Sequence, residues 1–235
     1  MAIQKKQNEA LNNEVQQKES FFDKNKKVLL YALCAVILLI VGFILYNNFV
    51  SKPKQDKANT TLAKAQELFM NGEYDLALNG DKGGAFPGMI KIADEYGSTD
   101  AGNLATLYAG LCYAQLALRD SVEKTNKEKW TKAKDYLEKY DPASDMMVGP
   151  AAIASLGEAY AHLGDLEKAA SLLKDAAAKA DNMSLSATYL VQAGEILESL
   201  DKKDEALKCY QTVKDKYFNS MAAQSIDRYI ERVKK

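Results

Sequence analysis

Residues 150–181 read PAAIASLGEAYAHLGDLEKAASLLKDAAAKAD, and residues 187–218 read ATYLVQAGEILESLDKKDEALKCYQTVKDKYF. The two segments align without gaps at an offset of 37 residues. In each, apolar residues recur at helical spacing on both sides of a short polar turn, which is Gly164-Asp165 in the first copy and residues 201–204 in the second. The pattern predicts two amphipathic helices per segment, that is, a repeated helical hairpin.

Small residues occupy matching positions in the two copies. Gly157 aligns with Gly194 on the first helix, and Ala169 aligns with Ala206 on the second. Side chains of this size let two helix backbones approach closely, and larger neighbours such as Tyr210 can fill the remaining gaps. One hairpin cannot bury its own apolar face, so neighbouring hairpins must stack. The sequence therefore predicts an all-α fold built as an α-solenoid.

Weaker copies extend the repeat toward the N-terminus. We expect a third hairpin at 103–141, in which the insertion 120–129, DSVEKTNKEK, lengthens the turn before a second helix that begins at Trp130. A degenerate copy at 58–100 contains the irregular loop 78–88, LNGDKGGAFPG.

The chain closes with SMAAQSIDRYIERVKK, residues 220–235. Its polar outer face is typical of a helix that caps a repeat array. Two helices are preceded by candidate N-cap residues, which are Ser98 or Thr99 in one case and Asn219 or Ser220 in the other.

The composition of residues 58–235 agrees with an all-α domain. They are rich in Ala, Leu, Lys and Glu, and no alternating run of β-branched residues suggests a strand. They carry 22 Lys and Arg against 27 Asp and Glu, and this balance of −5 argues against nucleic acid or anionic lipid as the main partner. Cys112 and Cys209 fall inside helical patterns, so we expect buried free thiols, while an oxidising compartment would permit a disulfide.

One stretch near the N-terminus is strongly apolar, unlike the rest of the chain. Residues 28–46, VLLYALCAVILLIVGFILY, contain no charge, and lysines flank them on both sides. A helix over these residues is roughly 28 Å long, which matches the hydrocarbon thickness of a bilayer. The long core and the lack of an A-x-A-like site disfavour a cleaved signal peptide, and the early position of Cys34 disfavours a lipoprotein signal. A buried core helix rarely excludes charge for so long, so we interpret the run as an uncleaved signal anchor.

These features divide the chain into a polar tail at 1–27, a transmembrane signal anchor at 28–50, a linker at 51–57 and a helical-repeat domain at 58–235. Four lysines lie within 12–27 and four within 51–66, so the positive-inside rule does not fix the orientation. The short tail and the long C-terminal domain favour a domain outside the inner membrane, in a bacterial periplasm. A domain that faces the cytoplasm stays open as the alternative.

The hairpins resemble the tetratricopeptide repeat. The residues that carry the resemblance are Leu156, Gly157, Tyr160, Ala169, Leu173 and Ala176. The layout is similar to membrane-anchored tetratricopeptide proteins of Bacteroidota, through residues 76–81, 96–105, 108–113 and 226–230. More distantly, it is similar to the YfgM-type ancillary subunit of the bacterial Sec translocon. That resemblance implies a single-pass protein of the bacterial inner membrane, with translocon subunits, a membrane-anchored periplasmic chaperone or translocating chains as partners.

Tetratricopeptide arrays bind partners in a concave groove lined by the first helix of each repeat. The resemblance places eight residues in such a groove: Tyr108, Leu111, Gln115, Glu158, His162, Gln192, Glu195 and Glu198. The positions that hold Lys or Arg and then Asn in carboxylate-clamp arrays are Leu107/Leu111, Ala154/Glu158 and Val191/Glu195 here. Capture of a peptide C-terminus is therefore not expected, and a mildly acidic groove suits basic or amphipathic helical segments. The alternative is that these residues are merely solvated.

No residue pattern indicates catalysis, a cofactor or a metal. His162 is the only histidine and has no Ser or Cys partner at a recognisable spacing. The glycines of 78–88 follow no strand and precede no GK[ST], so we expect a loop with Phe86 and Pro87 packed on the repeat rather than a phosphate site. The leading hypothesis is a non-enzymatic, membrane-tethered scaffold for protein–protein interaction, or a chaperone-assisting protein. The alternative is an adaptor on the cytoplasmic face that docks a soluble partner.

Overall fold

The computed structural model describes residues 25–142 and 148–235, and this part of the chain is helical and contains no strand. The all-α prediction is confirmed. The chain divides into two compact units, Met1–Pro53 and Lys54–Lys235.

In the first unit, residues 25–46 form an α-helix, and η1 (Asn47–Ser51) follows as a π-helical turn. The apolar side chains of this helix are exposed, as Leu38 and Leu39 show with exposed fractions of 71% and 74%. In the described residues, the continuous helix Asn25–Met70 is long and apolar enough to cross a membrane, and it contains the expected anchor 28–50.

The π-helical turn has a cause in the sequence. Pro53 has no N–H to donate to the carbonyl of Phe49, and its ring crowds that carbonyl. The Lys52 N–H donates instead to the carbonyl oxygen of Asn47, five residues back, which is the bond of a wide turn. Residues 51–57, expected as a linker, are therefore helical.

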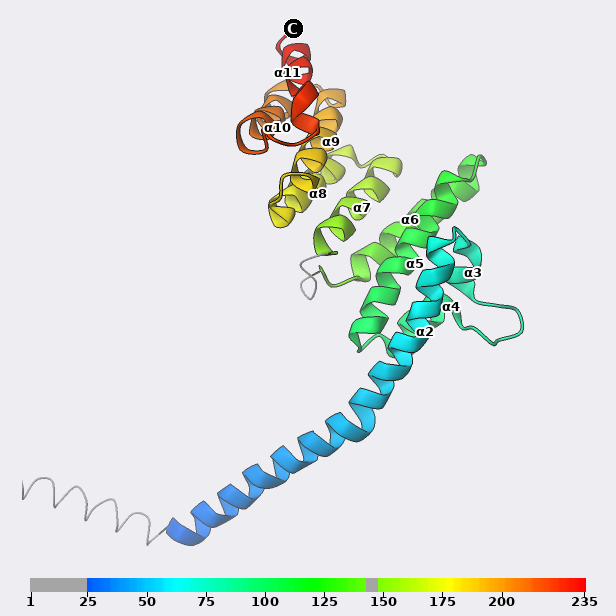
Figure 1. Cartoon of the computed structure of the whole chain (residues 1–235), viewed down its shortest axis with the longest axis vertical. Helices are drawn as coiled ribbons and strands as arrows, with labels where there is room; N and C mark the ends of the chain where they lie inside the picture. Colours follow the sequence, from blue (N-terminus) through cyan, green and yellow to red (C-terminus); the bar gives the residue numbers. More distant parts are fainter. Residues whose placement is uncertain (1–24, 143–147) are drawn as a thin grey trace, which may run out of the picture. The chain divides into compact units, whose positions relative to one another are not determined.

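The second unit is a series of antiparallel helices. Its helices are α2 (Lys52–Met70), α3 (Tyr74–Asn79), α4 (Gly88–Tyr96), α5 (Asp100–Leu118), α6 (Glu123–Lys139), α7 (Gly149–His162), α8 (Leu166–Ala180), α9 (Leu185–Ser199), α10 (Lys203–Lys216), η3 (Ala222–Ser225) and α11 (Ile226–Lys234). α3 packs against both α4 and α5, and from α4 onward each α-helix packs mainly against its neighbours in the chain (Figure 1). The 150–181 and 187–218 segments are the helix pairs α7–α8 and α9–α10, as their periodicity predicts.

The apolar core follows this order in three clusters. The cluster around Met89 joins α2 to α5, the cluster around Trp130 joins α5 to α7, and the cluster around Tyr210 joins α7 to α11. Cys112 and Cys209 are buried free thiols in different clusters, so the expectation of unpaired cysteines is confirmed. The core is therefore shared between successive helix pairs rather than gathered at one centre.

Two glycines permit close approaches that a side chain would block. A Cβ atom on Gly194 of α9 would lie 2.3 Å from Tyr210 Cε1 of α10, and one on Gly102 of α5 would lie 1.9 Å from the carbonyl oxygen of Tyr96. Both distances are far below van der Waals contact. Gly194, which is one of the two aligned glycines, thus has the packing role that the sequence predicts.

The N-cap predictions can be checked at both junctions. Thr99 caps α5, because its side-chain oxygen accepts a hydrogen bond from the Gly102 N–H at 3.0 Å. Ser220 accepts a hydrogen bond from the Ala223 N–H at 3.1 Å, but the N-cap of η3 is Met221. α11 begins only at Ile226, after Ser225, so the prediction of Asn219 or Ser220 as the N-cap of the last helix is wrong.

The structure corrects the prediction for the insertion at 120–129. The turn between α5 and α6 is short, and α6 begins at Glu123, so Trp130 lies in the middle of a helix rather than at its start. The inserted residues are mostly good helix formers and continue the helix instead of lengthening the turn. In the loop after α3, Phe86 is buried with an exposed fraction of 4%, as expected.

Candidate functional site: a groove between α7, α8 and α9

A groove of about 530 Å³ lies between three helices of the second unit. Its lining residues are Ala151, Ala154, Ser155, Glu158 and Ala161 from α7, Leu173 from α8, and Tyr189, Gln192, Glu195, Ile196 and Ser199 from α9. On both α7 and α9 these residues recur every three or four positions, so each helix presents one continuous face. The groove is thus formed by the two first helices of the aligned repeats.

The groove combines an apolar floor with negative charge. Leu173 and Ala154 are buried, while Glu158, Gln192 and Glu195 are exposed. The lining contains two carboxylates and neither Lys nor Arg. The side chains of Glu158, Gln192 and Glu195 make no hydrogen bond or ion pair within the described residues. Their charge and hydrogen-bonding capacity therefore face solvent in this structure.

Three of the eight candidate groove residues meet here: Glu158, Gln192 and Glu195. The three candidates on α5 lie elsewhere. Tyr108 is half-buried and packs edge-on against Phe69, with ring centroids 5.1 Å apart. Leu111 packs against the cluster around Trp130, and Gln115 is half-buried outside the groove lining.

Glu198 has a structural partner instead of a place in the groove. Its two carboxylate oxygens accept hydrogen bonds from Arg232 Nε and Nη2 of α11, at 2.8 and 2.7 Å. It also accepts a hydrogen bond from the Tyr210 hydroxyl at 2.5 Å. Burial acts to raise the pKa of Glu198, but the hydrogen bonds from Arg232 and Tyr210 outweigh it, and the pKa is lowered.

His162 is also engaged in packing. Its imidazole stacks on the indole of Trp130, with ring centroids 4.0 Å apart and an interplanar angle of 9°. The indole is buried with an exposed fraction of 1%, so His162 covers it from the solvent side. The only histidine of the chain therefore closes the contact between α6 and α7.

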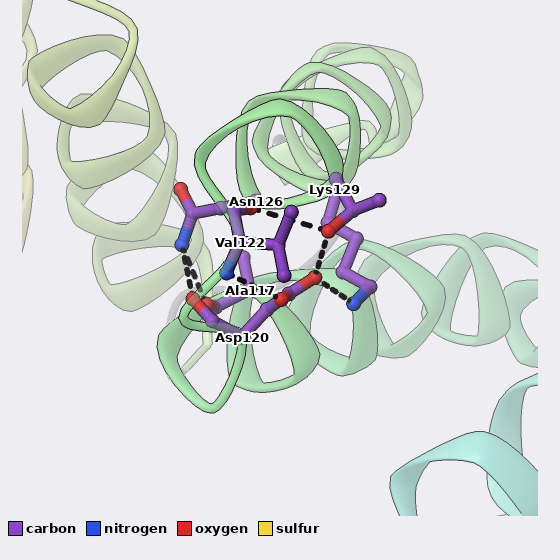
Figure 2. A network of polar contacts seen from close by, with 6 residues as sticks. Ala117, Asp120, Val122, Asn126 and Lys129 are labelled. Atoms are coloured by element: carbon purple, nitrogen blue, oxygen red, sulfur yellow. Dashed lines mark hydrogen bonds and ion pairs between the residues drawn. The ribbon is translucent and has the colours of Figure 1, made fainter.

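A second polar cluster lies at the turn between α5 and α6 (Figure 2). The Asp120 carboxylate accepts hydrogen bonds from the Val122 N–H at 2.9 Å, from the Thr125 hydroxyl at 2.6 Å and from Lys129 Nζ. The hydrogen bond from Lys129, followed by those from Thr125 and Val122, lowers the pKa of Asp120 to about 2. All these groups are mutually satisfied, so the cluster fixes the turn rather than offering a binding site.

Asn126 completes the fastening of this turn. Its side-chain amide donates to the carbonyl oxygens of Ala117 at 2.7 Å and Asp120 at 3.1 Å (Figure 2). These carbonyls belong to the last turn of α5 and to the second residue beyond its end, where backbone carbonyls have no partner within the helix. The inserted sequence therefore supplies the cap of the preceding helix.

Several groove residues were missed by sequence reasoning. Tyr189, Ile196 and Ser199 line the groove on α9, and Ser155 lines it on α7. Their spacing from Gln192 and Glu158 was visible in the sequence, but the same spacing also marks buried faces. Which face of a helix lines a groove depends on the angle at which neighbouring helices cross, and residue spacing along one helix does not give that angle.

Within the described ranges, no group of three or more His, Cys, Asp or Glu side chains could hold a metal ion. No protein-family model matches the chain, and a search of curated proteins finds no significant match.

Proposed function

We propose that the chain is a membrane-tethered scaffold for protein–protein interaction, whose helix pairs form a tetratricopeptide-like solenoid. The single observation that carries the proposal is the groove of α7, α8 and α9, in which two unpartnered carboxylates border an apolar floor. A surface that presents unsatisfied charge beside apolar side chains is typical of a binding site.

The chemistry of the groove defines the partner. The absence of Lys and Arg from its lining disfavours an anionic ligand such as a peptide C-terminus or nucleic acid. An amphipathic helix with Lys or Arg beside an apolar stripe complements both the carboxylates and the floor. We therefore propose a basic or amphipathic helical segment of another protein as the ligand.

The tether is proposed from the apolar helix. The helix Asn25–Met70 contains a span whose side chains have no partners within the described protein. A span of this kind holds the groove at the bilayer surface, where a weak ligand gains from high effective concentration. We propose a periplasmic groove in a bacterial inner membrane, where subunits of the Sec translocon, a membrane-anchored chaperone or translocating chains are candidate partners.

A cytoplasmic adaptor is the second candidate, because four lysines lie on each side of the span. Protease added to spheroplasts distinguishes the two orientations. A domain that is digested only after the membrane is breached would contradict the periplasmic proposal.

The binding proposal is tested by charge reversal in the full-length protein. Variant Glu158→Lys with Glu195→Lys reverses the groove, and variant Glu95→Lys with Asp175→Lys makes the same net change on exposed positions outside it. Affinity purification from gently solubilised membranes should lose its specific partner with the first variant and keep it with the second. Equal recovery of the partner with both variants would contradict the proposal that the groove binds it. If neither Sec nor chaperone components are recovered, the proposed link to the translocon is wrong.

A further inference from the structure

The large exposed apolar side chains of the second unit lie at the ends of its helices and in the adjoining turns. Of the seven in the described residues of this unit, Met70, Leu118 and Val122 lie at the end of α2 and at the turn between α5 and α6. The other four lie in the loops that follow α8 and α10 or, in the case of Leu185, at the first residue of α9. They are Met183, Leu185, Phe218 and Met221, with exposed fractions of 43%, 38%, 69% and 86%. Exposing such side chains to water is unfavourable, and several together mark a surface that meets something apolar.

The two loops are held side by side. Asp181, the C-cap residue just after α8, accepts a hydrogen bond from Lys216 Nζ at 2.7 Å and one from the Tyr217 hydroxyl at 3.3 Å. Lys216 and Tyr217 directly precede Phe218, and Asp181 precedes Met183 by two residues. The four apolar side chains therefore belong to one local patch at one end of the helix pairs.

This patch lies on an edge that leads back to the start of the second unit. Lys54 Nζ donates to the Ser98 hydroxyl at 3.1 Å, and Asn103 and Asp141 exchange two hydrogen bonds of 3.0 Å. Lys179 Nζ then donates to the carbonyl oxygen of Pro142 at 2.8 Å, one step before the bond between Lys216 and Asp181. We call this series of connections between helix pairs the loop edge. It comprises Lys54 and residues 98–103, 141–142, 179–185 and 216–221.

The first residue of the loop edge is close to the proposed bilayer by chain connectivity alone. Lys54 is the fourth residue after Val50, the last residue of the proposed anchor. Such a segment spans at most roughly 14 Å. The other end of α2 is different, because Met70 lies about 24 Å from Lys54 along the helix. The chain therefore passes from the proposed anchor into the second unit at the first residue of the loop edge.

We propose that the loop edge docks on the lipid bilayer, with Met183, Leu185, Phe218 and Met221 inserted at the level of the headgroups. The inference rests on the proposed membrane tether and adds a second contact with the same bilayer. Apolar loop tips gain free energy by leaving water for the acyl boundary, and lysines of the edge such as Lys54 and Lys216 can stay at headgroup level. Docking at both ends of the edge would fix how the groove is presented to a partner.

The test places one environment-sensitive probe on each end of the unit. The full-length protein, in a Cys34→Ala background that leaves only buried thiols, receives Met221→Cys or the control Met70→Cys and is labelled with the fluorophore NBD. The two methionines are comparably exposed, at 86% and 79%. Each protein is reconstituted in phosphatidylcholine vesicles with and without lipids that carry a nitroxide quencher.

The proposal predicts at least roughly threefold stronger quenching at position 221 than at position 70, with a blue-shifted emission at 221. A probe on Met183→Cys should lose this quenching when Phe218→Asp and Met221→Asp are added. Equal quenching at 221 and 70 would overturn the docking. A blue shift at 221 without quenching by the lipid nitroxide would also overturn it, in favour of a protein contact.

Failure of the tether gives a different result. If the protein leaves the vesicles in an alkaline carbonate wash, the membrane span itself is contradicted. If it stays with the vesicles while position 221 behaves like position 70, the tether stands and only the loop docking is wrong.

Discussion

Glu198 of α9 accepts two parallel hydrogen bonds from the guanidinium of Arg232 on α11, at 2.8 and 2.7 Å. The pair joins the last complete helix pair to the helix that covers its end. α11 buries Ile226, Ile230 and Val233 against the same cluster, so the ion pair fixes the orientation of a helix that apolar packing already holds. Glu198, which the sequence places in a binding groove, thus helps to hold α11 on the α9–α10 helix pair.

We expect Arg232→Ala to lower the free energy of unfolding by about 1 kcal/mol, and Arg232→Lys to recover only part of it, because an ammonium cannot form the fork. The expected loss of stability is small because the Arg232 side chain is 53% exposed, and water screens the ion pair. The pKa of Glu198 is lowered in the folded state, so the contribution is present above the unfolded pKa and is lost as the pH falls through the lower folded value. Urea unfolding of both variants at neutral and acidic pH measures it. An unchanged midpoint in Arg232→Ala would contradict the clamp.

Gly194→Ala should destabilise the second unit by about 1–3 kcal/mol, because a methyl group there would overlap the Tyr210 ring. The matched control is Gly83→Ala in the exposed loop after α3, where the nearest atom is a side-chain oxygen of Asp81 at 3.0 Å. Thermal unfolding should separate the two variants. If they melt together, the close approach of α9 and α10 is not needed for stability.

The positions of the most regular repeated helices were predictable from the sequence, but the contacts of their side chains with distant residues were not. The offset of 37 residues located α7 to α10, because amphipathic periodicity and aligned small residues are local properties of the chain. The predicted start of α6, at Trp130, was wrong. The prediction followed the expected length of the repeat and gave too little weight to the helix propensity of residues 123–129. The groove was predicted only in part. Glu198 binds Arg232 and His162 stacks on Trp130, and neither contact is visible in the sequence because the partners are distant along the chain.

Asp120→Asn should lower the melting temperature of the second unit at neutral pH. It should also make the melting temperature change less as the pH falls through the acidic range. The native carboxylate, with its pKa lowered to about 2, stabilises the fold above the unfolded pKa near 4 and loses this effect as the pH falls toward 2. The variant keeps an acceptor for the Val122 N–H but loses the charge that Lys129 faces. Thermal melts between pH 2 and pH 7 test this, with Asp175→Asn as an exposed control. Parallel pH profiles for wild type and Asp120→Asn would contradict the assignment.

Glu158→Gln and Glu195→Gln should leave stability within about 0.5 kcal/mol of wild type, because neither carboxylate has a partner to lose. The same substitutions should weaken binding of a cationic amphipathic helix, and the loss should shrink as salt rises. Calorimetric unfolding and a fluorescence-polarisation titration with a labelled Lys-rich amphipathic peptide measure the two effects. A marked loss of stability would show that these carboxylates support the fold rather than a ligand.

His162→Ala should shift the fluorescence of Trp130 to longer wavelength. Trp130 is the only tryptophan, so its emission reports this one position without correction. The indole is buried beneath the imidazole at a centroid distance of 4.0 Å, and removing the ring opens its face to water. His162→Phe, which can stack in the same place, should keep the emission of the wild type. Matching spectra for His162→Ala and His162→Phe would show that the stack does not shield the indole in solution.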